Sequence, residues 1–255
     1  MQLLRNIPEV LPQPCVATIG FFDGVHRGHR YLIEQVREVA VVHGFASGVV
    51  TFPVHPRKVV QPEYHPELLT AYEEKVALLA ETGLDYCMML DFTPEVAILS
   101  AKEFMLFLYN HYNIRALVIG YDHRFGHNRS EGFDDYVRYG QELGIEVILA
   151  HAYIDKDVAV SSSVIRQLLS EGNVSEAASC LGYDYFLNGI VVSGYRVGRK
   201  IGFPTANLRV DDPDKLVPSD GVYAVRVTVA GQSYGGMLSI CLLYTSPSPR
   251  DVEES

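Results

Sequence analysis

Cysteine is scarce in this chain, and long apolar runs are absent. The four cysteines stand at positions 15, 87, 180 and 241, without a C-x-x-C pair. This spacing argues against a zinc cluster and against a disulfide scaffold. No apolar run approaches the roughly 20 residues that a membrane helix needs. The N-terminal segment MQLLRNIPEVLPQPC lacks the apolar stretch of a cleavable signal, so a cytoplasmic protein is expected.

Positive charge is also in deficit. Lysine and arginine number 21 against 31 aspartates and glutamates, which gives a formal net charge of -10. General attraction to nucleic acid or to an anionic membrane is therefore not expected. An acidic protein that binds anionic substrates must do so locally, with placed cations, backbone amides or a metal.

From Cys15 to about Cys180, short apolar strands alternate with amphipathic helices. This alternation predicts a doubly wound α/β fold, with a parallel sheet covered on both faces. The strands are expected at 15–22, 45–52, 85–92, 116–122 and 145–153, and the helices at 28–43, 69–83, 101–112 and 133–144.

After Cys180 the composition changes. Segments 186–194, 221–231 and 232–240 are β-rich and have glycine-marked turns. They predict the start of a second, all-β domain, which is expected to be an incomplete barrel. The expected domains are therefore residues 1–182 and 183–240.

Residues 241–255 fit neither domain, because an alternating strand gives way to a Ser/Pro-rich polar segment. One interpretation is a disordered C-terminus, which this composition favours. The other is a foreign sequence, since residues 242–251 resemble translated sequencing-adapter sequence. The second interpretation is favoured, because an unfinished β-domain should not end in open edges.

The segment Thr18–His29, TIGFFDGVHRGH, runs from the end of an expected strand into an expected helix. Parallel sheets bind ligands at this place. Gly20 and Gly24 allow tight turns and a close approach of the backbone to phosphate. Gly28 opens the helix, whose free amides and dipole favour an anion. The segment therefore predicts a phosphate-binding turn.

His26 and His29 stand three residues apart in this segment, so both imidazoles can point into one phosphate pocket. Their N–H groups could stabilise the extra negative charge on a phosphorus under attack. An H-x-x-H pair alone also fits two surface residues or a chance zinc pair. The strand–glycine–helix context favours phosphate chemistry.

Two segments of the chain resemble motifs of a known superfamily. GFFDGVHRGH resembles the H-x-G-H signature of the nucleotidyltransferase superfamily, in the form typical of bacterial FAD synthetases. Downstream, VSSSVIRQLL (160–169) resembles the I-S-S-T-x-I-R element of that superfamily. A serine here can cap the following helix, and Arg166 is suited to act as a fixed cation for the β- and γ-phosphates. By itself this second motif also fits a helix cap with a surface arginine.

The resemblance implies a set of site residues. Histidines 26 and 29 would be catalytic together with the arginine of the second motif. For Asp23, a turn-capping role is favoured over contact with the nucleotide. The residues implied in ATP binding are Gly20, Phe21, Phe22, Asp23, Gly24, Gly28, Ser161, Ser162 and Ser163.

Two further segments resemble the flavin branch of the superfamily. TFPVHPRKV (51–59) resembles its T-F-x-P-H-P element, and GYDHRFGHNRSEG (120–132) resembles its G-x-D-F-x-F-G-x-x-R-x-G loop, with His123 in place of a phenylalanine. Core aromatics and loop-stabilising polar groups are the alternative interpretation. The flavin-binding residues implied are Phe52, His55, Asp122, Phe125 and Arg129.

Residues 184–240 resemble the riboflavin kinase module of the bifunctional bacterial enzyme, through GYRVGRKIGFPTANL and LVPSDGVYAVRV. The resemblance implies that Thr205 and Asn207 hold Mg-ATP, with Gly198 near phosphate. A generic glycine-rich hairpin is the alternative. The family's general-base glutamate follows a later N-x-G motif, and neither precedes Ile240. The chain is therefore expected to lack riboflavin kinase activity.

The function that the resemblance implies is the transfer of AMP from ATP to FMN, which gives FAD and pyrophosphate with Mg²⁺ as the metal. The expected substrates are ATP, FMN and riboflavin. One alternative is a related transferase that uses phosphopantetheine or nicotinamide mononucleotide. Another is a flavin- or nucleotide-binding protein without turnover. A histidine-based metal hydrolase is disfavoured, because the nine histidines form no second ligand cluster.

Overall fold

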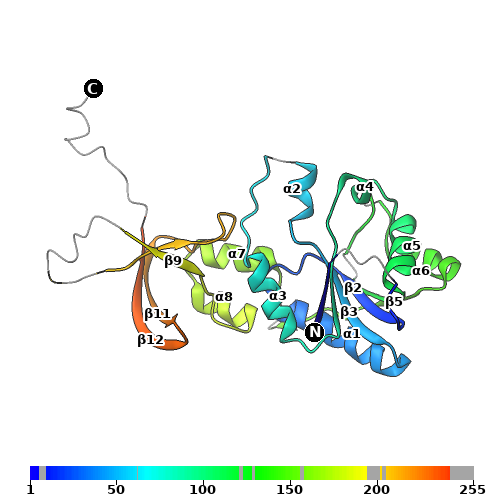
Figure 1. The fold of residues 1–255 in the computed structure, drawn as a ribbon, viewed down its shortest axis with the longest axis horizontal. Helices are drawn as coiled ribbons and strands as arrows, with labels where there is room; N and C mark the ends of the chain where they lie inside the picture. The colour runs from blue at the N-terminus through cyan, green and yellow to red at the C-terminus, as the bar shows by residue number, and fades with distance from the viewer. Residues whose placement is uncertain are drawn as a thin grey trace.

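A six-stranded parallel sheet forms the centre of the N-terminal part of the chain (Figure 1). The computed structural model describes residues 1–5, 10–61, 63–120, 123–127, 130–155, 158–193, 202 and 205–241. The strand order is β1-β4-β3-β2-β5-β6. The strands are β1 (Gln2–Arg5), β2 (Cys15–Ile19), β3 (Ala46–Thr51), β4 (Tyr86–Met89), β5 (Ile114–Ile119) and β6 (Glu146–Leu149).

The order of the strands reverses beside β2. From β2 the chain continues to β3 and β4 on one side, and it then returns to β5 and β6 on the other. Ligands bind at the carboxyl ends of the strands where such a sheet reverses its order. The segment that begins at Gly20 leaves β2 at this place, so the predicted doubly wound α/β fold is confirmed and the first motif lies at its ligand edge.

Helices cover both faces of the sheet. Helices α1 (Arg27–His43) and α3 (Tyr72–Ala80) pack on the face that carries Val16 and Val49. Helices α5 (Ala101–Tyr112) and α6 (Phe133–Leu143) pack on the other face. Strand side chains alternate between these two cores, which explains why β2, β3 and β4 are buried along their whole length. The shorter helices are α2 (Pro56–Val60), α4 (Pro94–Ala97), α7 (Ser162–Ser170), α8 (Val174–Leu181) and the 3-10 turn η1 (Asp23–Val25).

The helix expected over residues 69–83 starts later than predicted, at Tyr72. Leu69 and Thr70 instead precede the helix, and their backbone N–H groups donate to the carboxylate of Asp23. These tertiary hydrogen bonds to Asp23 therefore take the place of the first turn that was expected in the helix. The edge strand β1 was not predicted, because four residues are too few for a periodic pattern.

The β-rich region after α8 contains two antiparallel pairs among its described residues. Strand β9 (Gly189–Val192) pairs with β10 (Asn207–Val210), and β11 (Gly221–Val229) pairs with β12 (Gln232–Ile240). A smaller pair, β7 (Ile154–Asp155) and β8 (Val158–Ala159), precedes α7. Gly182 ends α8 in the left-handed conformation, directly before the change of composition. Residues 242–255 lie outside the described part of the chain.

Candidate active site

The turn between β2 and α1 has an unusual backbone. Phe22 and Val25 have positive φ angles of 56° and 36°, and Gly24 has a φ of 80°. This φ favours glycine, and a Cβ atom on Gly24 would lie 2.9 Å from the Leu69 side chain, which would have to shift. Gly20 joins this turn to the sheet, since its N–H donates to the carbonyl of Val50 at 3.0 Å. Strained backbone held by its surroundings is typical of functional sites.

His26 and His29 lie side by side at the beginning of α1. Their rings are stacked, with centroids 3.6 Å apart and an angle of 19° between the planes. The Nδ1 atom of His26 accepts the backbone N–H of His29 at 3.3 Å, which makes His26 the N-cap of the helix. In a neutral imidazole the proton of His26 is therefore on Nε2, where it can be donated. A Cβ atom on Gly28 would lie 3.2 Å from this ring, so a side chain would press on the pair.

Both histidines are kept neutral. Burial, together with the positive charge of Arg166, lowers the pKa of His26 from 6.5 to about 4. Burial is also the main cause that lowers the pKa of His29 well below 6.5, with smaller contributions from His26 and Lys75. The Nδ1 atom of His29 is buried and has no hydrogen-bond partner among the described residues. A buried polar atom without a partner is rare, and here it stands where an anion is expected.

The low pKa of His26 predicts acid sensitivity. Between pH 6.5 and 4 the unfolded chain binds a proton at this position and the folded chain does not, so stability falls as the pH drops. The contribution is roughly 3 kcal/mol to the free energy of unfolding. Urea denaturation at several pH values should show this decrease, and His26→Gln should reduce it. An identical pH dependence in the variant would contradict the assignment.

Asp23 is the hub of the site. Its buried carboxylate accepts the N–H groups of Leu69 and Thr70 at 2.9 and 3.0 Å, and also the Thr70 hydroxyl. It forms an ion pair of 2.6 Å with Arg166, whose Nε donates to the carbonyl of Glu67. The carboxylate is therefore used to hold the turn and to fix the guanidinium. This agrees with a turn-capping role, and contact with the nucleotide stays a prediction.

The three serines of the second motif differ in their roles. Ser161 caps α7, because its Oγ accepts the N–H of Val164 at 3.3 Å. Ser162 donates from Oγ to the backbone carbonyl of Asp23 at 3.0 Å, which ties the second motif to the first. Ser163 is exposed. The two motifs predicted from sequence thus meet in space, at Asp23.

Lys75 is a site residue that the sequence reasoning missed. Its side chain is buried, and its Nζ donates to the carbonyls of Phe21 and Phe52 at 3.2 and 2.7 Å. The ammonium also lies 3.8 Å from the centroid of the Phe21 ring. Burial lowers its pKa to about 8, and Asp23 opposes this shift. A signal exists in the sequence, because Lys75 is followed at i+3 and i+4 by core leucines.

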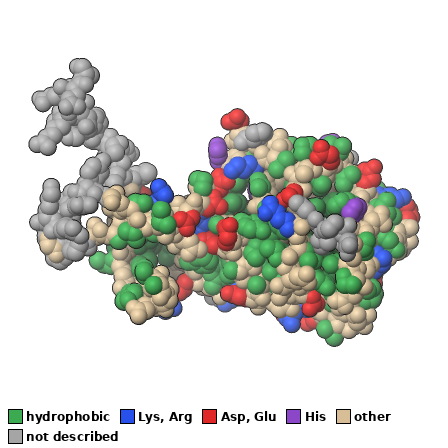
Figure 2. Space-filling view, viewed as in Figure 1, with side chains coloured by type: hydrophobic (Ala, Val, Ile, Leu, Met, Phe, Trp, Pro, Cys, Tyr) green, Lys and Arg blue, Asp and Glu red, His purple; other side chains and the backbone are tan. Residues whose placement is uncertain are grey.

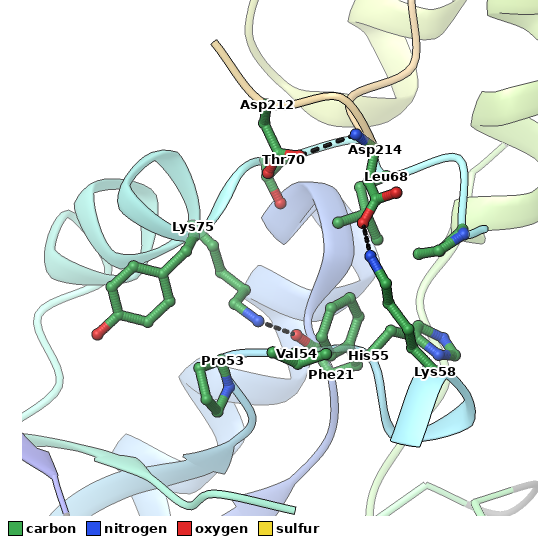
Figure 3. Close-up of a pocket in the computed structure, with 12 residues that line it drawn as sticks. Phe21, Pro53, Val54, His55, Lys58, Leu68, Thr70, Lys75, Asp212 and Asp214 are labelled. Atoms are coloured by element: carbon green, nitrogen blue, oxygen red, sulfur yellow. Dashed lines mark hydrogen bonds and ion pairs between the residues drawn. The ribbon is translucent and has the colours of Figure 1, made fainter. Parts of the chain in front are cut away.

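A cavity of about 130 Å³ opens beside this lysine (Figure 3). Figure 3 shows the ammonium of Lys75 directed at the carbonyl of Phe21, and Lys58 directed at Asp214. The cavity is smaller than a typical ligand site, so it suits one part of a substrate. The residues around it include Phe21, His55, Lys58, Thr70, Lys75 and Asp214.

The residues predicted to bind flavin are spread over different surroundings. His55 borders the cavity and lies edge-on to Phe21, with ring centroids 4.8 Å apart. Phe52 packs against Phe92 in the core, and Phe125 stacks on the buried Tyr136. Both phenylalanine rings pack in the core of this structure, and their contact with a flavin stays a prediction. Asp122 and Arg129 lie outside the described residues.

The residues predicted for the kinase module lie around β10. Asn207 begins this strand and Thr205 precedes it, and both side chains are exposed. Gly198 lies outside the described residues. Across the described part of the chain, no group of three or more His, Cys, Asp or Glu side chains is placed to hold a metal ion.

The surface adds two observations. On the face drawn in Figure 2, acidic and basic side chains are interspersed with apolar ones. None of the helices in the described ranges is both long and apolar enough to cross a membrane.

Comparison with known families assigns both parts of the chain. A family model described as FAD synthetase matches residues 9–164, and one described as riboflavin kinase matches residues 181–253. The second match includes most of residues 241–255, which were expected to belong to neither domain. It gives no support to the expectation that the kinase module is truncated and its activity lost.

Curated relatives agree with these matches. A bifunctional riboflavin kinase/FMN adenylyltransferase from Escherichia coli K12 is 36% identical over 236 residues, which cover 91% of this chain and 75% of the relative. Proteins of the same name from Listeria monocytogenes and Bacillus subtilis are 35% and 33% identical, each over 88% of this chain and 71% of the relative.

A solved structure has the same fold. It is titled a macrolide-efflux protein from Streptococcus pneumoniae, and it is 34% identical with a TM-score of 0.80, covering 90% of this chain and 74% of that one. Taken with the stacked histidines at the ligand edge of the sheet, these matches lead to one conclusion. The chain belongs to the bifunctional riboflavin kinase/FMN adenylyltransferase family.

Proposed function

We propose that the site around His26 and His29 transfers AMP from ATP to the phosphate of FMN, which gives FAD and pyrophosphate. The observation that carries this proposal is the stacked pair of neutral imidazoles at the beginning of α1. One of them keeps a buried nitrogen without a partner among the described residues. Free amides at a helix start and imidazole N–H donors suit a phosphate that gains charge during reaction.

The chemical step needs little from the protein beyond position and charge. A phosphate oxygen of FMN attacks the α-phosphorus of ATP in line, and the bond to the pyrophosphate oxygen breaks. The attacking oxygen is already anionic near neutral pH, so no general base is required. His26 would donate from Nε2 to the α-phosphate, and His29 would stabilise the same oxygens. The neutral state of both rings in the free protein suits donation without a permanent charge.

Arg166 would neutralise the departing pyrophosphate. Its Nη2 and Nε are held by Asp23 and the carbonyl of Glu67, so its position is set before the substrate binds. Mg²⁺ would arrive on the phosphates of ATP and add charge neutralisation there. Arrival of the metal on ATP fits the site, because the Asp23 carboxylate already binds two backbone amides and the Arg166 guanidinium and would not serve as a metal ligand.

The acceptor side of the site is proposed around the cavity near Phe21. His55 and Phe21 offer aromatic edges, and Lys75 supplies a buried positive charge behind them. Among the described residues proposed for the flavin, His55 is the one that borders this cavity. FMN carries both an aromatic ring system and a phosphate, so it matches this combination better than an acceptor without a large ring.

A coupled assay for pyrophosphate and FAD tests the proposal, with the purified chain, Mg-ATP and FMN. FAD formation is the expected result. Pyrophosphate release with phosphopantetheine or nicotinamide mononucleotide, and none with FMN, would favour a related transferase. Tight binding of ATP or FMN without pyrophosphate release would favour a binding protein without turnover.

Riboflavin phosphorylation is a second candidate activity, because the riboflavin kinase model matches residues 181–253. In this activity Thr205 and Asn207 would hold Mg-ATP through their side-chain oxygens. Incubation of the purified chain with riboflavin and Mg-ATP tests whether it has riboflavin kinase activity. FMN formation would contradict the sequence-based expectation of a lost kinase, and its absence would support that expectation. A cytoplasmic location also stays a prediction.

A further inference from the structure

A segment of the riboflavin kinase match lies against the adenylyltransferase part. Residues 212–216 run beside residues 68–70, and Leu68 and Lys215 form a parallel β-bridge. The N–H of Leu68 donates to the carbonyl of Asp214 at 2.7 Å, and the N–H of Leu216 donates to the carbonyl of Leu68 at 2.8 Å. The loop before α3 is therefore extended by backbone from the other part of the chain.

Lys215 closes this contact with a buried ion pair. Its Nζ lies 2.6 Å from a carboxylate oxygen of Glu74, and the two side chains are 1% and 4% exposed. The same Nζ donates to the carbonyl of Leu69 at 2.7 Å. The other carboxylate oxygen of Glu74 accepts from Asn188 at 2.9 Å, and the ring of Tyr185 lies 4.5 Å from the ammonium. Every charge in this cluster thus has a partner.

On its other side, the segment 68–70 contacts Asp23 of the first motif. Leu69 receives Lys215 at its carbonyl and donates its N–H to Asp23, and Asp23 forms the ion pair with Arg166. Four residues therefore form one continuous series of hydrogen bonds from the kinase-like region to the guanidinium. A shift of the peptide at Leu69 would move the carboxylate that fixes Arg166.

A gain in folding stability does not by itself explain the buried pair of Lys215 and Glu74. Removing two charges from water is costly, and well-packed apolar residues in the same place are often as stable. A buried pair does fix the direction of its hydrogen bonds, because the ammonium must face both the carboxylate and the carbonyl. The observed geometry uses that direction to hold one peptide in place.

We propose that Lys215, with Glu74, is a positioning residue for adenylyl transfer, although it lies within the riboflavin kinase match. It acts through Leu69 and Asp23 on Arg166. The inference rests on the proposed function of the site around His26. It adds that a residue outside the FAD synthetase match sets the position of the cation that meets the leaving pyrophosphate.

The test is the double variant Lys215→Met with Glu74→Gln, which removes both charges without leaving one unpaired. In the full chain with Mg-ATP and FMN, kcat should fall about tenfold while both KM values change less than about twofold. Hydrogen exchange at the amides of Leu69 and Thr70 should become faster. Arg209→Met, an exposed change of the same charge in the same region, is the matched control and should leave both readouts unchanged.

Coupling to Arg166 has its own measurement. In an Arg166→Ala background, the double change should lower kcat by less than about twofold, because the path it acts on is already broken. If the double variant does not fold, Lys215→Arg, which keeps a cation opposite Glu74 but changes the position of the donor, should lower kcat by about threefold.

The outcomes are distinct. A wild-type chain that forms no FAD would end the proposed function and this inference with it. A wild-type chain that forms FAD, with wild-type kcat and unchanged amide exchange in a folded variant, would overturn the inference alone. An equal loss of kcat with and without Arg166 would overturn it too.

Discussion

Replacing His29 with alanine is expected to lower kcat for FAD formation by about 100-fold or more, because the site loses one donor to the reacting phosphate. The KM for ATP should change far less, since in the proposed mechanism the helix amides and Arg166 would still bind the nucleotide. His29→Gln, which retains an N–H donor, should recover part of the loss. Steady-state kinetics with FMN and Mg-ATP measure both constants.

The control for this prediction lies on the same helix. His43 stands at the exposed end of α1 and pairs with Glu146 at 2.8 Å, far from the motif turn. His43→Ala should leave kcat unchanged. Thermal unfolding must be compared as well, because the His29 ring packs edge-on against Phe22. An unchanged kcat in folded His29→Ala would remove His29 from the chemistry.

Replacing Asp23 with asparagine is expected to give the largest loss of stability, about 3 kcal/mol or more in the free energy of unfolding. The amide group of asparagine would face donors from Leu69, Thr70 and Arg166, and one of its two positions cannot accept them. FAD formation should be lost as well, because Arg166 is no longer fixed. Urea denaturation and the FAD assay measure the two effects.

Asp134→Asn is the matched change at an exposed position in the first turn of α6. It should alter the free energy of unfolding by less than about 0.5 kcal/mol. A comparable loss in the free energy of unfolding in both variants would mean that the hydrogen bonds of Asp23 contribute no more to stability than an exposed aspartate does. Full activity of folded Asp23→Asn would contradict the role of the ion pair with Arg166.

The sequence predicted the sheet well, for a local reason. Strands such as β3 are apolar along their whole length, and helices such as α1 have a cap, an apolar stripe and a terminal glycine within one stretch of chain. Such signals need no distant partner. The resemblance of Thr18–His29 and of residues 160–169 to known motifs also indicated the candidate site, and the structure brings these segments together through Ser162.

Other site features depended on partners far away in the sequence. The spacing of Lys75 to the core leucines Leu78 and Leu79 indicates that it is buried, but its partners, the carbonyls of Phe21 and Phe52, come from other segments of the chain. The stacking of Phe125 on Tyr136 could not be foreseen from the loop sequence alone. The unpredicted late start of α3 has the same cause, since Asp23 takes the amides of the residues before it.

By itself, the sequence determined the α/β class and the turn after β2, and it placed His26 and His29 together at the start of a helix, because periodicity, glycine placement and helix capping act within a few residues. Only the tertiary structure decided which way Asp23 points, what holds Arg166, and that Lys215 reaches the same network. Hydrogen bonds between segments 46 to 146 residues apart leave no local pattern, so their geometry exists only once the chain has folded.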